Sequence, residues 1–293
     1  MCKCDQTTEG EARFMRALCY FYLLNYFGDV PLALTTDYRV NATLPRSPKE
    51  EVWRLVINDL QQSALLCSEN FLNASFDQAT EERVRPTKWV ALALLARASL
   101  YTEHYERADS AATAVIDQSS RFELIPVNGE FLKNSRGAIW QIQPTNSNTY
   151  RNAAEGRYFV LTAGGPVTYM EDQSTFLNET MVNAFKAEPG DARVSSWINS
   201  VSANGNLYYF AYKYKIGSEN VPTQEYSTRF RLSEQYLIRA EARAMLNNIT
   251  GAREDINAVR GRANLGESPA GDQLALLNAV EKERRIELFT EGH

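Results

Sequence analysis

Apolar positions recur along most of this chain with the period of an α-helix. A first helix is predicted from about Glu9 to Phe27, where one face carries Phe14, Leu18, Phe21 and Leu24. Gly28 is expected to close this helix, because glycine easily adopts the left-handed turn that follows a helix. Pro31 lies just beyond it and cannot continue the helical hydrogen bonding. The pattern therefore predicts one long helix with a firm stop.

The same helix is rich in aromatic side chains: Tyr20, Phe21, Tyr22, Tyr26 and Phe27. Two interpretations are open at this point. The helix is buried nearly all round, or some of its aromatic rings serve a ligand.

Two more amphipathic helices are predicted outside this segment. Residues 47–66 form one, with Ser47 as the expected N-cap and Pro48 at the first helical position. The chain ends in the other, "LLNAVEKERRIELFTEGH", in which Glu281 and Arg285 are spaced for an i, i+4 ion pair.

Two helical hairpins with matching small residues suggest an internal repeat. The first is predicted over 85–101 and 104–118, and the second over 234–246 and 248–260. Small residues at equivalent positions mark where two helices approach closely: Ala98, Ala108 and Val115 in the first hairpin, Ala242, Ala252 and Val259 in the second. This pattern is typical of tetratricopeptide-like units, although any tightly packed helical hairpin also favours small residues at its crossing.

An irregular segment separates the two hairpins. Residues 119–231, the insertion, are rich in Asn, Gly and Tyr and contain one predicted strand (137–144) and one predicted helix (174–187). The remaining parts, 9–118 and 232–290, form the predicted helical scaffold. The fold class is therefore mostly α, with tetratricopeptide-like hairpins and a long loop-rich insertion that holds a few short strands. Insertions of this kind usually carry the ligand surface.

Composition and motifs exclude several functional classes. The net charge of −5 disfavours nucleic acid as a partner, because a phosphate backbone selects a basic surface. The chain has two His and no Cys-x-x-Cys pair, so we expect no metal site and no cofactor. No nucleophile motif is present and we expect no enzyme activity, although the many carboxylates leave a glycoside hydrolase as a rival hypothesis.

The remaining possibility is a binding surface. Sugars present C–H faces that pack on aromatic rings and hydroxyl groups that need amide, carboxylate or guanidinium partners. Candidate ligand-binding residues of this kind in the insertion are Asn146, Asn148, Tyr150, Asn152, Tyr158, Trp197, Tyr208 and Tyr209, and the loop after Pro31 adds Tyr38, Arg39 and Asn41. Local packing or a turn amide is the alternative role for each of them.

Five segments, in the right order, together resemble the SusD/RagB family of outer-membrane nutrient-binding lipoproteins. They are residues 10–32 with "GDVPL", 85–101, 183–193 with "NAFKAEPGDAR", 226–265 and 281–293 with "EKERRIELFTEGH". The resemblance covers nearly the whole chain and implies a single domain over residues 1–293. It also implies that the aromatic helix belongs to the scaffold, so that Tyr22 and Phe27 are expected in the core.

The resemblance further implies a function. We expect non-catalytic binding of an oligosaccharide or polysaccharide at the surface of the outer membrane, and its delivery to a SusC-like TonB-dependent β-barrel transporter. Peptide capture, as in the RagB branch, is the first alternative. A cytosolic tetratricopeptide adaptor for protein partners is the second, although its repeats would be in tandem.

The chain also departs from the family pattern at both ends. Family members carry a signal sequence and an acylated cysteine, whereas no apolar segment precedes Cys2 here, so the lipid anchor is expected to be missing from this chain. The family's sequence also continues beyond the motif that ends at His293. We therefore expect this chain to be the central block of a longer protein.

Overall fold

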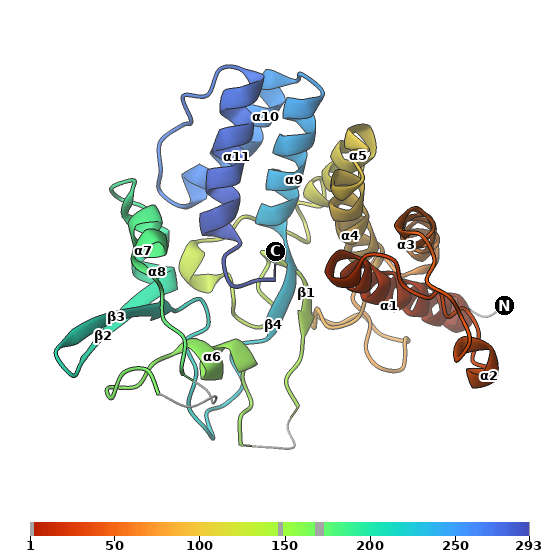
Figure 1. Cartoon of the computed structure of the whole chain (residues 1–293), viewed down its shortest axis with the longest axis horizontal. Helices are drawn as coiled ribbons and strands as arrows, with labels where there is room; N and C mark the ends of the chain where they lie inside the picture. The colour runs from red at the N-terminus through yellow and green to blue at the C-terminus, as the bar shows by residue number, and fades with distance from the viewer. Residues whose placement is uncertain (1–2, 146–148, 168–172, 293) are drawn as a thin grey trace.

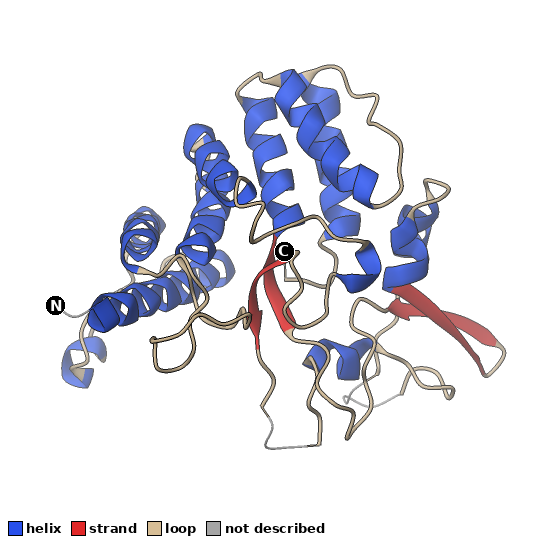
Figure 2. Ribbon diagram, turned by 180° about the vertical axis from the view of Figure 1, so that it is seen from behind, coloured by secondary structure: helices blue, strands red, loops and turns tan. Residues whose placement is uncertain are grey.

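Helical hairpins form one side of the molecule, and a less regular part with short strands forms the other (Figures 1 and 2). The computed structural model describes residues 3–145, 149–167 and 173–292. The helices of the scaffold are α1 (Lys3–Phe27), α3 (Lys49–Leu66), α4 (Lys88–Tyr101), α5 (Tyr105–Ile116), α9 (Leu232–Met245), α10 (Ile249–Arg262) and α11 (Gln273–Glu287). No helix in the described ranges is both long and apolar enough to span a bilayer.

The scaffold consists of stacked hairpins. α1 pairs with α3, α4 with α5 and α9 with α10, while α11 packs on α9 and α10. α5 also packs against α9, so the second and third hairpins are neighbours although the insertion separates them in sequence (Figure 1). The small residues predicted at the crossings are fully buried: Ala98, Ala108, Val115, Ala242, Ala252 and Val259. The prediction of a mostly α, tetratricopeptide-like fold is confirmed.

Ion pairs with buried carboxylates join helices both within a hairpin and between neighbouring hairpins. Asp59 of α3 is fully buried and accepts hydrogen bonds from Arg16 (2.7 Å) and Arg13 (3.2 Å) of α1. Arg97 of α4 donates to both carboxylate oxygens of Glu234 on α9, at 2.6 and 2.8 Å. Burial alone would lower the pKa of Arg97, but the adjacent Glu234 carboxylate raises it above its usual value.

The less regular part contains two small antiparallel sheets. Strand β1 (Ala138–Ile142) pairs with β4 (Ser227–Arg231), and β2 (Ile198–Ala203) pairs with β3 (Asn206–Ala211). The short helices are η1 (Val127–Gly129), α6 (Ala154–Phe159), α7 (Glu179–Lys186) and α8 (Ala192–Trp197), and α2 (Tyr38–Asn41) lies between α1 and α3.

The sequence predicts only the first of these four strands. Its predicted bounds, 137–144, contain β1, and Gln141 is buried as part of the core. Strand β2 was missed because its sequence, INSVSA, is mainly polar. The dipeptide Asn204–Gly205 is a usable sequence signal, because Asn-Gly is typical of tight hairpin turns. In the structure these two residues join β2 to β3, with φ angles of 51° and 77°.

Helix α1 is buried on one face only. Tyr20 and Phe21 lie in the core and Tyr22 packs partly against it, whereas Tyr26 and Phe27 remain 71% and 64% exposed. The expectation that Phe27 is a core residue is therefore wrong. The reason is that α1 packs mainly against α3, which leaves the opposite face at its C-terminal end in solvent.

Three local predictions also need correction. Helix α3 begins at Lys49 rather than Pro48, and its N-cap is Pro48 rather than Ser47. Ser47 instead forms a β-bridge with Val30, and Asp29 accepts a hydrogen bond from the Lys49 amide at 2.9 Å. The helix predicted over 174–187 begins at residue 179, after Asn178, whose side chain caps it. No ion pair joins Glu281 to Arg285 among the described residues.

Asp29 therefore acts as a remote cap for α3, and its removal should be measurable. We expect Asp29→Ala to lower the free energy of unfolding by about 1 kcal/mol, because an amide at the start of α3 loses its acceptor. Asp29→Asn keeps an acceptor oxygen and should retain most of the stability. Urea denaturation of both variants tests this, and equal losses for Ala and Asn would contradict the capping role.

Candidate functional site

A cavity of about 640 Å³ opens at the strand side of the molecule, next to α6. Its walls come from the segment after β1, from α6, from residues 216–218, from β4 and from residues 290–292 at the end of the chain. We call this cavity the α6 pocket. Segments that are far apart in sequence meet here because β1 pairs with β4 and the chain end returns beside them (Figure 1).

Aromatic rings and charged groups share the pocket lining. The guanidinium of Arg157 lies 4.1 Å from the centre of the Tyr150 ring, in a cation–π arrangement. Tyr158, on the same short helix as Arg157, is 51% exposed. The Glu155 carboxylate accepts a hydrogen bond from the Ser227 hydroxyl at 2.5 Å and lies 3.4 Å from the Arg229 guanidinium. Rings beside charged hydrogen-bonding groups suit a polar ligand that also has apolar faces.

Asn152 supports the pocket wall from inside. Its side-chain oxygen accepts hydrogen bonds from the backbone amides of Gln224 (2.7 Å) and Glu225 (3.0 Å). Its side-chain nitrogen donates to the carbonyl oxygens of Val221 and Pro222. Because Asn152 is buried and its polar atoms have partners, its side chain fixes the loop at the pocket wall, and ligand contact by Asn152 stays a prediction.

A close backbone contact brings α6 against the neighbouring loop. A Cβ atom at Gly156 would lie 2.4 Å from the carbonyl oxygen of Ile216, so this position excludes any side chain. Nearby, the buried Glu225 carboxylate accepts hydrogen bonds from the amides of Lys215 and Ile216. Burial raises the pKa of Glu225, and these amides oppose that effect.

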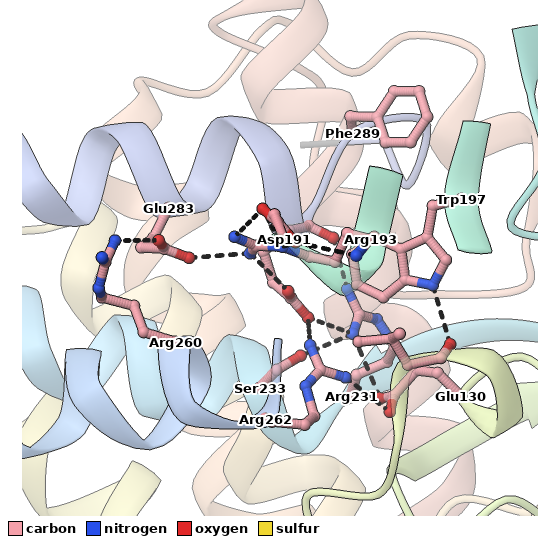
Figure 3. A network of polar contacts seen from close by, with 12 residues as sticks. Glu130, Asp191, Arg193, Trp197, Arg231, Ser233, Arg260, Arg262, Glu283 and Phe289 are labelled. Atoms are coloured by element: carbon pink, nitrogen blue, oxygen red, sulfur yellow. Dashed lines mark hydrogen bonds and ion pairs between the residues drawn. The ribbon is translucent and has the colours of Figure 1, made fainter. Parts of the chain in front are cut away.

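The chain end that lines the pocket is held by a buried ionic network around Glu287. Figure 3 labels Arg193, Arg231 and Arg262, which belong to this network. The Glu287 carboxylate contacts Arg193 of α8 at 3.1 Å, Arg231 of β4 at 2.8 Å and Arg262 of α10. All four side chains are buried. The other members of this Glu287 network are Glu130, Asp191, Lys213, Glu283 and Glu291.

The surrounding cations keep Glu287 ionised despite its burial. Burial alone would raise the pKa of Glu287, but Arg262, Arg231 and Arg193 together hold that pKa well below its usual value. The network thereby ties α11 to α8, β4 and α10.

Lys213 links the network to the pocket. Its buried ammonium group donates to the carbonyl oxygens of Glu287 (2.7 Å) and Phe289 (2.8 Å) and to the Glu291 carboxylate (2.5 Å). Burial lowers the pKa of Lys213 to about 8, and Glu291 opposes that shift. Since Glu291 itself lines the α6 pocket, Lys213 fixes this part of the pocket wall.

Trp197 belongs to this network rather than to a ligand surface. The indole is completely buried and its N–H donates to the Val127 carbonyl oxygen at 2.9 Å. Cationic groups of Lys213 and Arg262 lie 4.6 and 5.4 Å from its ring. The expectation that Trp197 contacts a ligand is therefore corrected, because a ring without exposed surface cannot stack on a sugar.

The structure does not bring all of the remaining predicted ligand residues to one place. Tyr150 and Tyr158 line the α6 pocket, but α2 with Tyr38, Arg39 and Asn41 lies beside α1 and α3, away from α6 (Figure 1). Arg39 pairs there with Asp37 at 3.0 Å. Asn146 and Asn148 lie outside the described residues.

The two tyrosines of β3 are also separate from the α6 pocket. Tyr208 packs edge-on against Phe176, with ring centres 5.1 Å apart. The Tyr209 hydroxyl accepts a hydrogen bond from Lys186 at 2.9 Å.

Sequence reasoning missed the charged residues of the pocket, which are Glu155, Arg157, Arg229 and Glu291. A local signal existed for two of them, because Glu155 and Arg157 closely precede the predicted Tyr158 on one short segment. Arg229 had no such signal, since β4 was not predicted as a strand.

The Glu287 network predicts a distinctive response to acid. Burial raises the pKa of Glu291, but Arg231 and Lys213 outweigh that effect and lower it below 4.5. A carboxylate with a lowered pKa contributes stability above its unfolded pKa, and this stability is lost as the pH falls through the folded pKa. Unfolding free energies should therefore fall as the pH drops below about 4.5.

Glu291→Gln should lower the stability at neutral pH by about 3 kcal/mol or more, because two buried cations lose a charged partner. It should also make the acid dependence shallower. Urea denaturation between about pH 7 and pH 3.5 measures both effects. Glu219→Gln, at an exposed position outside the network, is the control. An unchanged acid slope in Glu291→Gln would contradict the role given to this carboxylate.

Comparison with known proteins identifies the family. A model described as "SusD family" matches residues 136–293, which is more than half of the chain, and one described as "Starch-binding associating with outer membrane" matches residues 3–100. SusD-like protein P38 of Formosa agariphila is 26% identical over 97% of this chain and 64% of its own length, so the chain spans less than two-thirds of that relative.

Solved structures agree with this result at the level of the fold. A SusD superfamily protein from Bacteroides vulgatus superposes with a TM-score of 0.82 at 18% identity, over 100% of this chain and 66% of its own. A SusD-like carbohydrate-binding protein from Bacteroides vulgatus gives a TM-score of 0.79 at 21% identity, over 100% and 62%. With a family model covering residues 136–293, the chain belongs to the SusD family, as its sequence motifs predict.

Proposed function

We propose that this protein binds an oligosaccharide or polysaccharide at the surface of the outer membrane without catalysing a reaction, and that it hands the ligand to a TonB-dependent transporter. The family descriptions support this proposal, since one of them names starch binding and association with the outer membrane. A structural relative is also described as carbohydrate-binding. In this proposal a lipid anchor outside this chain attaches the whole protein to the membrane.

The α6 pocket is the proposed glycan site. The observation that carries this assignment is the half-exposed ring of Tyr158 beside the Arg157–Tyr150 stack and the Glu155 carboxylate. The ring offers a flat apolar face to the C–H groups of a sugar, and the charged groups offer partners to its hydroxyls. The volume of about 640 Å³ lies within the range of about 300–1,000 Å³ typical of ligand sites.

The state of the pocket carboxylates favours binding over hydrolysis. A glycosidase needs a carboxylic acid with a raised pKa to protonate the leaving group. Glu291 has a lowered pKa and is held by Arg231 and Lys213, which is not the setting of a general acid. One oxygen of Glu155 contacts Ser227 and Arg229.

Isothermal titration against neutral and charged glycans and against peptides tests the proposal. We expect Tyr158→Ala to weaken glycan binding by about 0.5–1.5 kcal/mol, because it removes the exposed stacking face. Tyr38→Ala is a matched control, since Tyr38 is an exposed tyrosine on α2.

Four results would count against parts of this proposal. A flat titration with every glycan would overturn glycan binding, and a response to peptides alone would favour peptide capture. Equal losses in Tyr158→Ala and Tyr38→Ala would remove the assignment to the α6 pocket. Release of reducing sugar during incubation with a bound glycan would contradict the absence of catalysis.

A further inference from the structure

A second cavity of about 370 Å³ lies on the scaffold, between α3 and the turn that joins α4 to α5. We call it the α3 groove. It shares no lining residue with the α6 pocket, and α3 and α6 lie apart in both views (Figures 1 and 2). The half-buried side chains of Trp53 and Ile57 give it an apolar floor.

Two arginines without a carboxylate partner line this groove. Arg54 of α3 and Arg107 of α5 form no ion pair within the described parts of the chain. The Nε of Arg107 donates to the Ser99 hydroxyl at 2.8 Å, and the Nε of Arg54 lies 3.4 Å from the Glu50 carbonyl oxygen. Burial lowers the pKa of Arg107 from its usual value, and no nearby carboxylate opposes this. The terminal guanidinium nitrogens are therefore available to an anion.

The groove also holds neutral hydrogen-bonding groups. Asn58 and Gln61 are exposed on α3 and have no hydrogen-bond partner for their side chains among the described residues. His104 lies across from them, with its Nδ1 2.6 Å from the Thr102 carbonyl oxygen. Among the residues that the structure describes, the Glu50 carboxylate is the one acidic group in the lining.

We propose that the α3 groove binds a sugar ring that carries an anionic substituent, either a carboxylate or a sulfate ester. The anion fits between the two guanidinium groups, which form strong charge-assisted hydrogen bonds with such groups. The ring lies on the indole of Trp53, and its hydroxyls reach Asn58 and Gln61. An inorganic anion would leave the apolar floor empty, and a neutral sugar would leave both guanidinium groups unpaired.

Calorimetric titration with four probes tests this site: trigalacturonate, sulfated maltotriose, maltotriose and sodium sulfate. We expect at least one anionic trisaccharide to bind more tightly than maltotriose and sodium sulfate, and to bind more weakly as the salt concentration rises. The anionic probe that binds identifies the substituent. Maltotriose binding that is as tight as that of the anionic trisaccharides and is weakened equally by Arg107→Gln would overturn the proposal, and so would no binding of either anionic trisaccharide.

Amino-acid substitutions test whether the anionic trisaccharide binds in the α3 groove. Arg107→Gln should weaken the anionic probe about tenfold or more, because a charged hydrogen-bond partner is lost. Gln61→Glu should weaken it similarly through charge repulsion, without removing any contact within the fold. Arg253→Gln, at an exposed position on α10, is the matched control. Trp53 is left unchanged because its ring packs against Phe21 of the core.

The α6 pocket serves as an internal reference in this experiment. Tyr158→Ala should leave binding of the anionic probe in the α3 groove unchanged, so the two sites can fail independently. A loss in Tyr158→Ala with no loss in Arg107→Gln would assign the anionic probe to the α6 pocket and overturn the second site.

Discussion

The arrangement of this protein depends on one buried carboxylate, that of Glu287, surrounded by three guanidinium groups. Arg193, Arg231 and Arg262 come from α8, β4 and α10, and Glu287 is the last residue of α11. Placing these charges in the interior is costly, and only their mutual pairing offsets the cost. A shift of any one of these elements would leave a buried charge without its partner. The network therefore fixes how the insertion meets the scaffold more strictly than apolar packing would.

The same network sets the geometry of the α6 pocket. Lys213 and Arg231 hold the carbonyl oxygen of Glu287 and the carboxylate of Glu291, and the chain end then runs along the pocket. The opposite wall is fixed by Asn152, whose side chain is bonded to backbone groups of the neighbouring loop. Irregular segments therefore present a defined surface, because buried polar groups in the interior position them.

The scaffold could be predicted from the sequence, whereas the site could be predicted only in part. The helical period and the small residues at helix crossings, such as Ala98 and Ala242, are local signals that can be read from a short stretch of any helical hairpin. The Glu287 network was not predictable, because its members come from separate segments and resemble ordinary surface charges in the sequence. Trp197 was misassigned for the same reason, since its environment consists of distant cations. Tyr150 and Tyr158 were identified, but not the partners that the fold brings to them.

The pairing of β1 with β4 has an architectural consequence. Ile142 lies opposite Ser227, so residues 143–226 begin and end side by side at one end of this two-stranded sheet. Residues can be added to or removed from the loops of this segment at a modest entropic cost of loop closure, without moving the stacked hairpins. This segment can therefore vary in length, provided that Arg193 and Lys213 keep their partners in the Glu287 network.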